Sequence, residues 1–79
     1  MTGYKSFGDA VAEAGKSAKK WKYAGDGKVF EKEELIKMSG FYDEKISPDG
    51  WNYFVCFEGG EIGLLSTFDN SVELLFSPA

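Results

Sequence analysis

Apolar side chains near the start of the chain recur with the spacing of one face of an α-helix. They stand at relative positions 0, 3, 4, 7, 11 and 14, as Phe7, Ala10, Val11, Ala14, Ala18 and Trp21. Such a stripe is typical of an amphipathic helix that packs against a core. Ser6 is a candidate N-cap, with Asp9 in the place of the capping-box acid, and lysines follow in the late turns. We therefore predict a helix over residues 6–21.

The segment 30–38 fits either a helix or a strand. Glu33 and Lys37 form a favourable i,i+4 pair, and Ser39-Gly40 is suited to end a helix. In the alternative the segment is extended, and Ile36 and Met38 face the interior. Local propensity favours the helix, and the tertiary context decides between the two.

The second half of the chain predicts strands joined by tight turns. Ser47-Pro48-Asp49-Gly50 has Pro and Gly where a type I turn prefers them. Residues 51–58 are rich in aromatic and β-branched side chains, which is typical of a strand. Gly59-Gly60 fits a two-residue hairpin loop that leads into a second strand over 61–66. After a polar turn around Phe68, a last short strand completes the meander.

The strand predicted over 51–58 is apolar on both faces. Alternation places Phe54 and Cys56 on one face and Trp51, Tyr53, Val55 and Phe57 on the other. An antiparallel strand with one face in water alternates apolar with polar residues instead. The second face therefore needs a cover. We expect the N-terminal helix to provide it, and a partner protein is the alternative.

Composition sets further limits. The chain has 79 residues and is 16% aromatic, which suits one domain over residues 1–79 with a small core. The absence of His excludes imidazole catalysis and imidazole metal ligation. The single Cys56 excludes an intrachain disulfide and a cysteine zinc site, and we expect its thiol to be a small core side chain. No apolar run reaches the ~18 residues of a membrane span, and the N-terminus lacks a secretion-signal layout. We expect a cytoplasmic protein with no cofactor, no bound metal and no membrane association.

Charge is distributed unevenly along the chain. The formal net charge is −4, and all nine basic residues are Lys. Residues 1–22 carry five Lys against two acids, whereas residues 46–79 carry five acids and no basic residue. An acidic chain without Arg is poorly suited to bind phosphate backbones or to read guanine. Direct nucleic-acid binding is therefore disfavoured.

Several stretches resemble the SH3-type small β-barrel. Residues 30–38 resemble the family's Phe, basic-pair and two-strand pattern. The sequence Asp49-Gly50-Trp51 resembles the opening of the family's central strand. Residues 60–65 and 70–75 resemble its last hairpin and closing strand. The resemblance implies an α+β, mainly β fold: a five-stranded antiparallel SH3-like barrel over residues 28–76, extended at 30–38, with the helix 6–21 added to it.

The resemblance does not extend to the proline-binding residues of that family. Of these only Trp51 has a clear counterpart, since Ser66 stands in the place of the Pro and Ser71 in the place of the Tyr. A proline-rich ligand is therefore not expected. The pattern is also similar to short phage- and prophage-encoded accessory proteins, which implies a host protein as the target.

These observations lead to a candidate binding site and a function. We expect a non-enzymatic protein-binding module, an accessory or inhibitor protein that occludes a partner's surface. Aromatic side chains at a loop-rich end are typical anchors, and acids around them favour a basic partner. The expected anchors are Trp51, Tyr53, Phe41 and Tyr42, and the expected steering acids are Asp49, Glu58 and Glu61.

Two other functions remain open. The acidic half of the chain is the basis for an alternative, in which the protein mimics nucleic-acid charge and blocks a DNA- or RNA-binding protein. A third hypothesis is direct single-strand binding by the aromatics together with Lys16, Lys19 and Lys20. The protein is expected to be a monomer or a homodimer.

Overall fold

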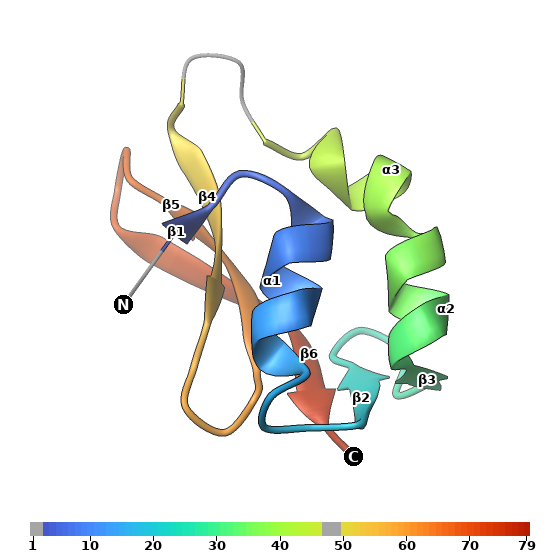
Figure 1. The fold of residues 1–79 in the computed structure, drawn as a ribbon. Helices are drawn as coiled ribbons and strands as arrows, with labels where there is room; N and C mark the ends of the chain where they lie inside the picture. The colour runs from blue at the N-terminus through green and yellow to red at the C-terminus, as the bar shows by residue number, and fades with distance from the viewer. Residues whose placement is uncertain (1–2, 47–49) are drawn as a thin grey trace.

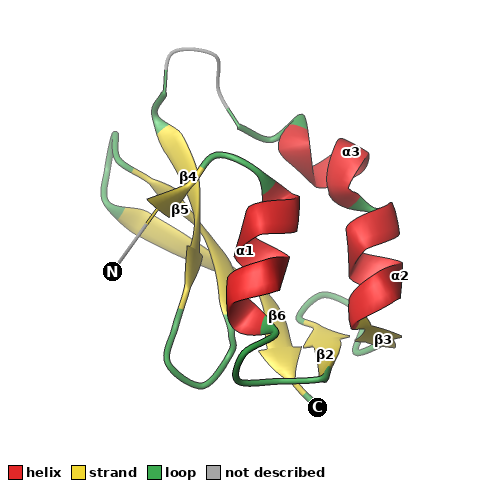
Figure 2. Cartoon of the chain, in the orientation of Figure 1, coloured by secondary structure: helices red, strands yellow, loops and turns green. Residues whose placement is uncertain are grey.

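A computed structural model describes residues 3–46 and 50–79. It has an α+β fold that is mostly β: one open sheet of six antiparallel strands and three short helices (Figures 1 and 2). The elements are β1 Gly3–Tyr4, α1 Phe7–Ala14, β2 Lys20–Tyr23, β3 Val29–Glu31, α2 Lys32–Lys37, α3 Ser39–Asp43, β4 Asn52–Cys56, β5 Ile62–Ser66 and β6 Ser71–Pro78. The strands follow the order β1-β4-β5-β6-β2-β3, so β6 joins the meander β4-β5-β6 to the pair β2-β3.

The sheet does not confirm a closed five-stranded barrel. It has six strands, and among the described residues no strand pairing joins β1 to β3, the two ends of the strand order. Segment 30–38 also differs from what the barrel resemblance implies. It leaves β3 at Glu31 and continues as α2, which confirms the helix for residues 32–37. Glu31 and Glu34 form a capping box at the start of α2, a local signal that favours a helix.

The core lies between the sheet and the helices, and Phe7 occupies its centre. The Phe7 ring is fully buried. It stacks on Tyr42 of α3 at a centroid distance of 4.6 Å and meets the edge of Phe54 of β4 at 5.3 Å. It also approaches Phe76 of β6 at 5.8 Å. One side chain at the start of α1 thus contacts a second helix and two strands.

The N-terminal helix is shorter than predicted. It ends at Ala14, and the N–H groups of Ser17 and Ala18 both donate to the Ala14 carbonyl as the chain turns away. Trp21 therefore belongs to β2 rather than to the helix. Its ring is fully buried, and its Nε1–H donates to the Gly60 carbonyl at 2.8 Å. The predicted helix included Trp21 because its position fits the apolar helical spacing. The ring does point into the core, but it does so from strand β2.

The loop between β4 and β5 is longer than the two residues predicted. Gly60 N–H donates to Phe57 O at 2.9 Å, and Phe57 N–H donates to Glu61 O at 3.0 Å. Gly60 has a φ of 99°, as in a turn followed by a glycine bulge. The turn predicted at 47–50 falls mainly on residues outside the described ranges; within them, Gly50 has a φ of 84°.

The start of α1 is capped by a different residue from the one predicted. Ser6 makes no side-chain capping hydrogen bond. Instead, the Phe7 N–H donates to Asp43 Oδ1 at 2.7 Å, across 36 residues of sequence. The carboxylate at the end of α3 thus satisfies a helix N–H that has no partner within α1. This hydrogen bond joins the same two helices as the stacked rings of Phe7 and Tyr42.

Replacing Asp43 by Ala should lower the free energy of unfolding by about 1 kcal/mol, because the N-cap hydrogen bond is lost. Urea denaturation followed by circular dichroism measures this change. Glu44→Ala is the matched control, since Glu44 is an exposed acid at the same end of α3. Equal stability of the two variants would show that the Asp43 bond does not stabilise the fold.

Candidate binding surface

The helices cover only one face of the sheet, and it is not the face that sequence reasoning assigned to them. All three lie on the same side of β4 and β5 (Figure 1). Phe54 of β4 faces α1 and is fully buried. Cys56 lies on that face too, with its Sγ 3.0 Å from the Ala10 carbonyl of α1. Tyr53, Val55 and Phe57 point to the opposite side, so the expectation that α1 covers them is wrong.

We call that opposite side the outer face. Strand register places its members, because directly paired residues of neighbouring strands point to the same side. Tyr53 pairs with Leu65, and Leu65 pairs with Val72. Val55 pairs with Gly63, and Gly63 pairs with Leu74. The outer face is therefore formed by Tyr53, Val55 and Phe57 of the β4 segment, Leu65 of β5, and Val72 and Leu74 of β6.

The outer face contains a hollow of about 260 Å³. It is lined by Gly3, Tyr53, Val55, Leu65 and Thr67. Gly3 pairs with Val55 on one side and Gly63 pairs with it on the other. Leu74 completes this row across the sheet, so two of its four residues lack a side chain, and one of them, Gly3, lines the hollow.

Two aromatic rings stand at one end of the outer face. Trp51 precedes β4, and Phe68 lies in the turn between β5 and β6; their rings meet edge to face at 5.6 Å. Thr67 fixes this end, because both its N–H and its hydroxyl donate to the Trp51 carbonyl, at 2.7 and 2.8 Å. Trp51 is 46% exposed and Phe68 is 78% exposed. We call this pair the aromatic end.

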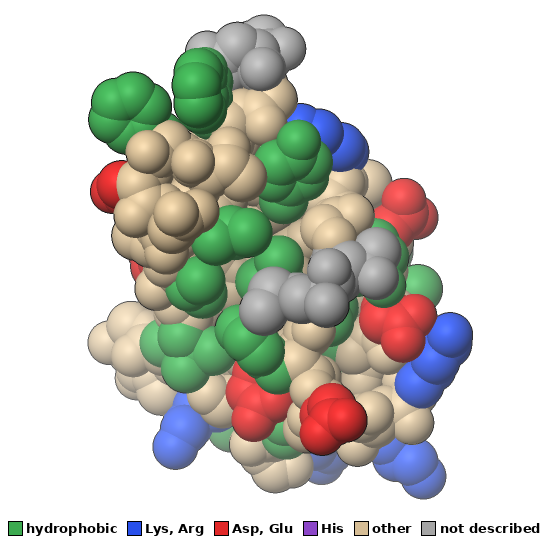
Figure 3. Space-filling view, turned by 90° about the vertical axis from the view of Figure 1, so that its left-hand side faces the viewer, with side chains coloured by type: hydrophobic (Ala, Val, Ile, Leu, Met, Phe, Trp, Pro, Cys, Tyr) green, Lys and Arg blue, Asp and Glu red, His purple; other side chains and the backbone are tan. Residues whose placement is uncertain are grey.

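Phe68 was not among the expected anchors. The sequence offered a signal that would have identified it: one large aromatic residue inside a polar turn, where the backbone lies at the surface. Figure 3 looks onto this side of the molecule, and hydrophobic side chains extend over it from the top to the lower half. Acidic side chains appear below them.

The expected anchors Phe41 and Tyr42 do not belong to this surface. Tyr42 is 5% exposed and packs in the core, where burial raises the pKa of its hydroxyl. Its ring is therefore not accessible to a partner, which corrects the expectation. Phe41 is 64% exposed, but it belongs to α3 in the helix layer, with Lys45 Nζ 5.4 Å from its ring centroid. Of the four expected aromatic anchors, the structure brings together Trp51 and Tyr53.

The expected steering acids lie away from the aromatic end. Glu58 and Glu61 flank the loop between β4 and β5, and Trp51 precedes the other end of β4. At about 3.3 Å per strand residue, the two ends are about 20 Å apart. Asp49 lies outside the described residues. Asp69 adds an acid at the aromatic end, and hydrogen bonds from the Ser71 N–H and hydroxyl lower its pKa.

Residues 50–79 contain four acids and no lysine. Two of the acids flank the loop end of the outer face and one lies at the aromatic end. The fourth, Glu73, pairs with Leu64, so it points to the opposite side of the sheet. Lys5 is the cation closest to the outer face among the contacts of the described residues, with its Nζ 3.9 Å from the Tyr53 ring centroid. The surface is thus apolar in its middle and acidic at the loop end, whereas the aromatic end has Asp69 and, near Gly50, the ammonium group of Lys5.

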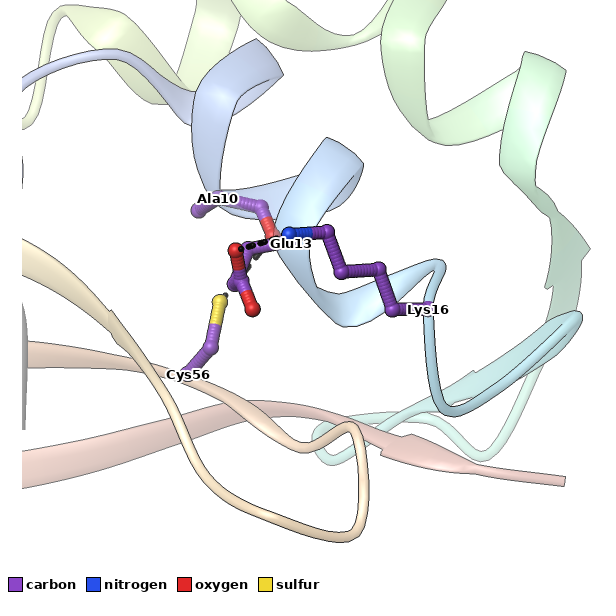
Figure 4. A network of polar contacts seen from close by, with 4 residues as sticks. All are labelled: Ala10, Glu13, Lys16 and Cys56. Atoms are coloured by element: carbon purple, nitrogen blue, oxygen red, sulfur yellow. Dashed lines mark hydrogen bonds and ion pairs between the residues drawn. The ribbon is translucent and has the colours of Figure 1, made fainter.

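Cys56 has the environment of a core thiol. Its Sγ donates to the Ala10 carbonyl, and the 3.1 Å ion pair between Glu13 of α1 and Lys16, which follows the helix, lies beside it (Figure 4). Burial, helped by the negative charge of Glu13, raises the pKa of the thiol from 9.0 to about 11. The thiol is therefore protonated near neutral pH, whereas a nucleophilic cysteine requires the thiolate.

The described residues show no group of three or more acidic or thiol side chains arranged to hold a metal ion. None of their helices is long and apolar enough to span a bilayer. In the comparisons with known proteins, no family model, no curated protein and no solved structure matches the chain.

The raised pKa of Cys56 predicts how stability changes with pH. Because the folded thiol holds its proton more tightly than the unfolded one, its contribution is complete below about pH 9 and is lost as the pH rises toward 11. The free energy of unfolding of the wild-type protein should fall over this range. Cys56→Ala should show a shallower fall, since lysine and tyrosine titration is common to both proteins. If the free energy of unfolding falls equally in the two proteins between pH 8 and pH 11, the raised pKa of Cys56 does not contribute to stability.

Proposed function

We propose that this protein is a non-enzymatic protein-binding module that docks a partner on its outer face. The observation that carries the proposal is the aromatic end beside the hollow. Trp51 and Phe68 present large rings to solvent, and Thr67, which is bonded to the Trp51 carbonyl, lines the hollow. Rings of this kind are frequent binding hot spots, because they bury a large area when a partner excludes water from around them.

The proposal revises the set of anchors. Trp51 and Tyr53 are kept, Phe68 is added, and Tyr42 is removed because it lies in the core. Glu58 and Glu61 remain as acids at the rim, with Asp69 at the opposite end. Rim acids contribute to association rate and partner choice more than to affinity. They favour a partner with a basic surface, which the module would occlude as a small accessory or inhibitor protein in the cytoplasm.

The resemblance to SH3-like barrels stays part of the proposal only in a restricted sense. The meander β4-β5-β6, preceded by Trp51, supports it. The helix at residues 32–37 and the six-stranded open sheet do not. Docking on the outer face depends on exposed side chains and not on membership of that family.

Mimicry of nucleic-acid charge remains the second candidate. The acid-only composition of residues 50–79 favours it. The arrangement favours it less, because these acids lie at both ends of the meander and Glu73 points away from the outer face. Mimicry predicts steep salt dependence and loss of binding when the acids are neutralised, whereas docking on the outer face predicts loss when the rings are removed.

A photocrosslinking amino acid at position 68 should capture the partner in source cells, and the same amino acid at position 36 is the control. Ile36 is a suitable control because it is 47% exposed on α2, away from the outer face. Mass spectrometry then identifies the partner so that it can be purified for binding measurements. Adducts that form equally from both positions would contradict docking at the aromatic end.

With the purified partner, Trp51→Ala should weaken binding by at least ~2 kcal/mol, or about 30-fold, as expected of a hot spot. Ile36→Ala should leave the affinity unchanged, and circular dichroism confirms that both variants are folded. If the affinity of Trp51→Ala equals that of the wild type while Glu58→Gln/Glu61→Gln abolishes binding, the charge-mimic function replaces the proposed one.

A further inference from the structure

β4, β5 and β6, which form the outer face, offer side chains to an occupant but no free strand edge, and the free edges of the sheet belong to β1 and β3. β4 is paired with β1 and β5, β5 with β4 and β6, and β6 with β5 and β2. An extended peptide lying across these strands would leave its own N–H and C=O groups unpaired against an apolar surface. An α-helix satisfies its backbone groups internally and avoids this penalty. The geometry therefore favours a helix over an extended peptide.

The length of the outer face sets the length of such a helix. The face extends from the aromatic end along β4 to the loop of Glu58 and Glu61, which is about 20 Å at the usual strand rise. A helix rises 1.5 Å per residue, so about 13 residues, between three and four turns, match this length. The hollow of about 260 Å³ has room for one large apolar side chain. Anchors at i, i+3 or i+4 and i+7 would contact the aromatic end, the hollow and the neighbouring β6 side chains.

The charges around the outer face favour a helix of another protein over a second copy of this chain as the occupant. Two copies can pack outer face to outer face with a two-fold axis along the strands or across them. The first arrangement brings Glu58 and Glu61 near their own counterparts, and the second brings them near Asp69. Acids face acids in the first arrangement, and in the second the two glutamates approach Asp69 together with Lys5. Each chain has a net charge of −4. Lys5, over the Tyr53 ring, offsets only part of this repulsion. A helix with basic residues at its two ends is complementary instead.

We propose that the occupant of the outer face is a basic amphipathic α-helix of a partner protein, about 13 residues long. One large apolar side chain of this helix fills the hollow beside Tyr53, and its lysines or arginines lie near Asp69 at one end and near Glu58 and Glu61 at the other. This inference rests on the proposed protein-binding function and specifies the chemistry of the partner.

The test uses two synthetic peptides of about 14 residues made only of Leu and Lys. In the first, the leucines fall on one helical face; in the second, the same residues are scrambled so that no apolar face forms. Titration into the 79-residue protein, followed by NMR, should show binding of the first at least about tenfold tighter than the second. The Trp51 indole signal and the methyl signals of Leu65, Val72 and Leu74 should shift.

Variants of the protein identify the site. Trp51→Ala/Phe68→Ala should weaken binding of the amphipathic peptide by about tenfold or more. Glu58→Gln/Glu61→Gln should weaken it by about threefold at low salt. Glu33→Gln/Glu44→Gln removes the same charge from exposed positions in the helix layer, so a smaller effect there shows that the position of the acids matters and not only the net charge.

Three results would overturn the inference. They are equal affinity of the two peptides, a dissociation constant of the amphipathic peptide weaker than about 1 mM, and a dimer in sedimentation experiments that is broken by Leu74→Lys. The last result would identify a second copy as the occupant. These results can be distinguished from failure of the proposed function. If a partner is captured at position 68 and Trp51→Ala weakens its binding, docking on the outer face is still established, with an occupant other than a basic helix.

Discussion

The sheet of this protein has two apolar faces, but the chain has helices for only one of them. α1, α2 and α3 all pack on the side of Phe54. Burial of apolar area is the main favourable term in folding, and a chain of 79 residues has little left to cover a second face after forming one core. The outer face, with its hollow and its exposed rings, follows from this imbalance. The same imbalance is the reason for assigning a binding function to this side.

The covered side depends on the position of α1. Phe7 at its first turn contacts α3, β4 and β6, and the Asp43 carboxylate holds the N–H of the same residue. An eight-residue helix is too short to be stable alone, so these tertiary contacts hold it in place. The ring contacts and the capping hydrogen bond thus both act at Phe7. They orient the helix toward Phe54 and Cys56 and away from the outer face.

The site was predictable in its chemistry and less so in its geometry. Trp51 and Tyr53 could be chosen because the strand 51–58 has more apolar residues than one buried face can use. Tyr42 could not be told from Phe41, since adjacent residues of a short helix point in different directions and only docking decides which one is buried. Phe68 has a signal in the sequence, a lone aromatic residue in a polar turn, but the ring that it contacts could not be read from the sequence. Its proposed role as an anchor depends on Trp51, whose ring lies 5.6 Å from it.

Local patterns determined the start of the N-terminal helix at Phe7 and the meander that follows Trp51, and they favoured the helix over 32–37 without deciding between helix and strand. In each case neighbouring residues carry the information, through apolar spacing, a capping box or strand propensity. The end of that first helix, the cap at Asp43 and the face that α1 covers were decided only by the tertiary structure. These three features have the same physical cause, which is contact between residues far apart in the sequence. Trp21, Asp43 and Phe54 are defined by partners far along the chain, and alternation in a strand specifies two faces without specifying which one the helix will bury.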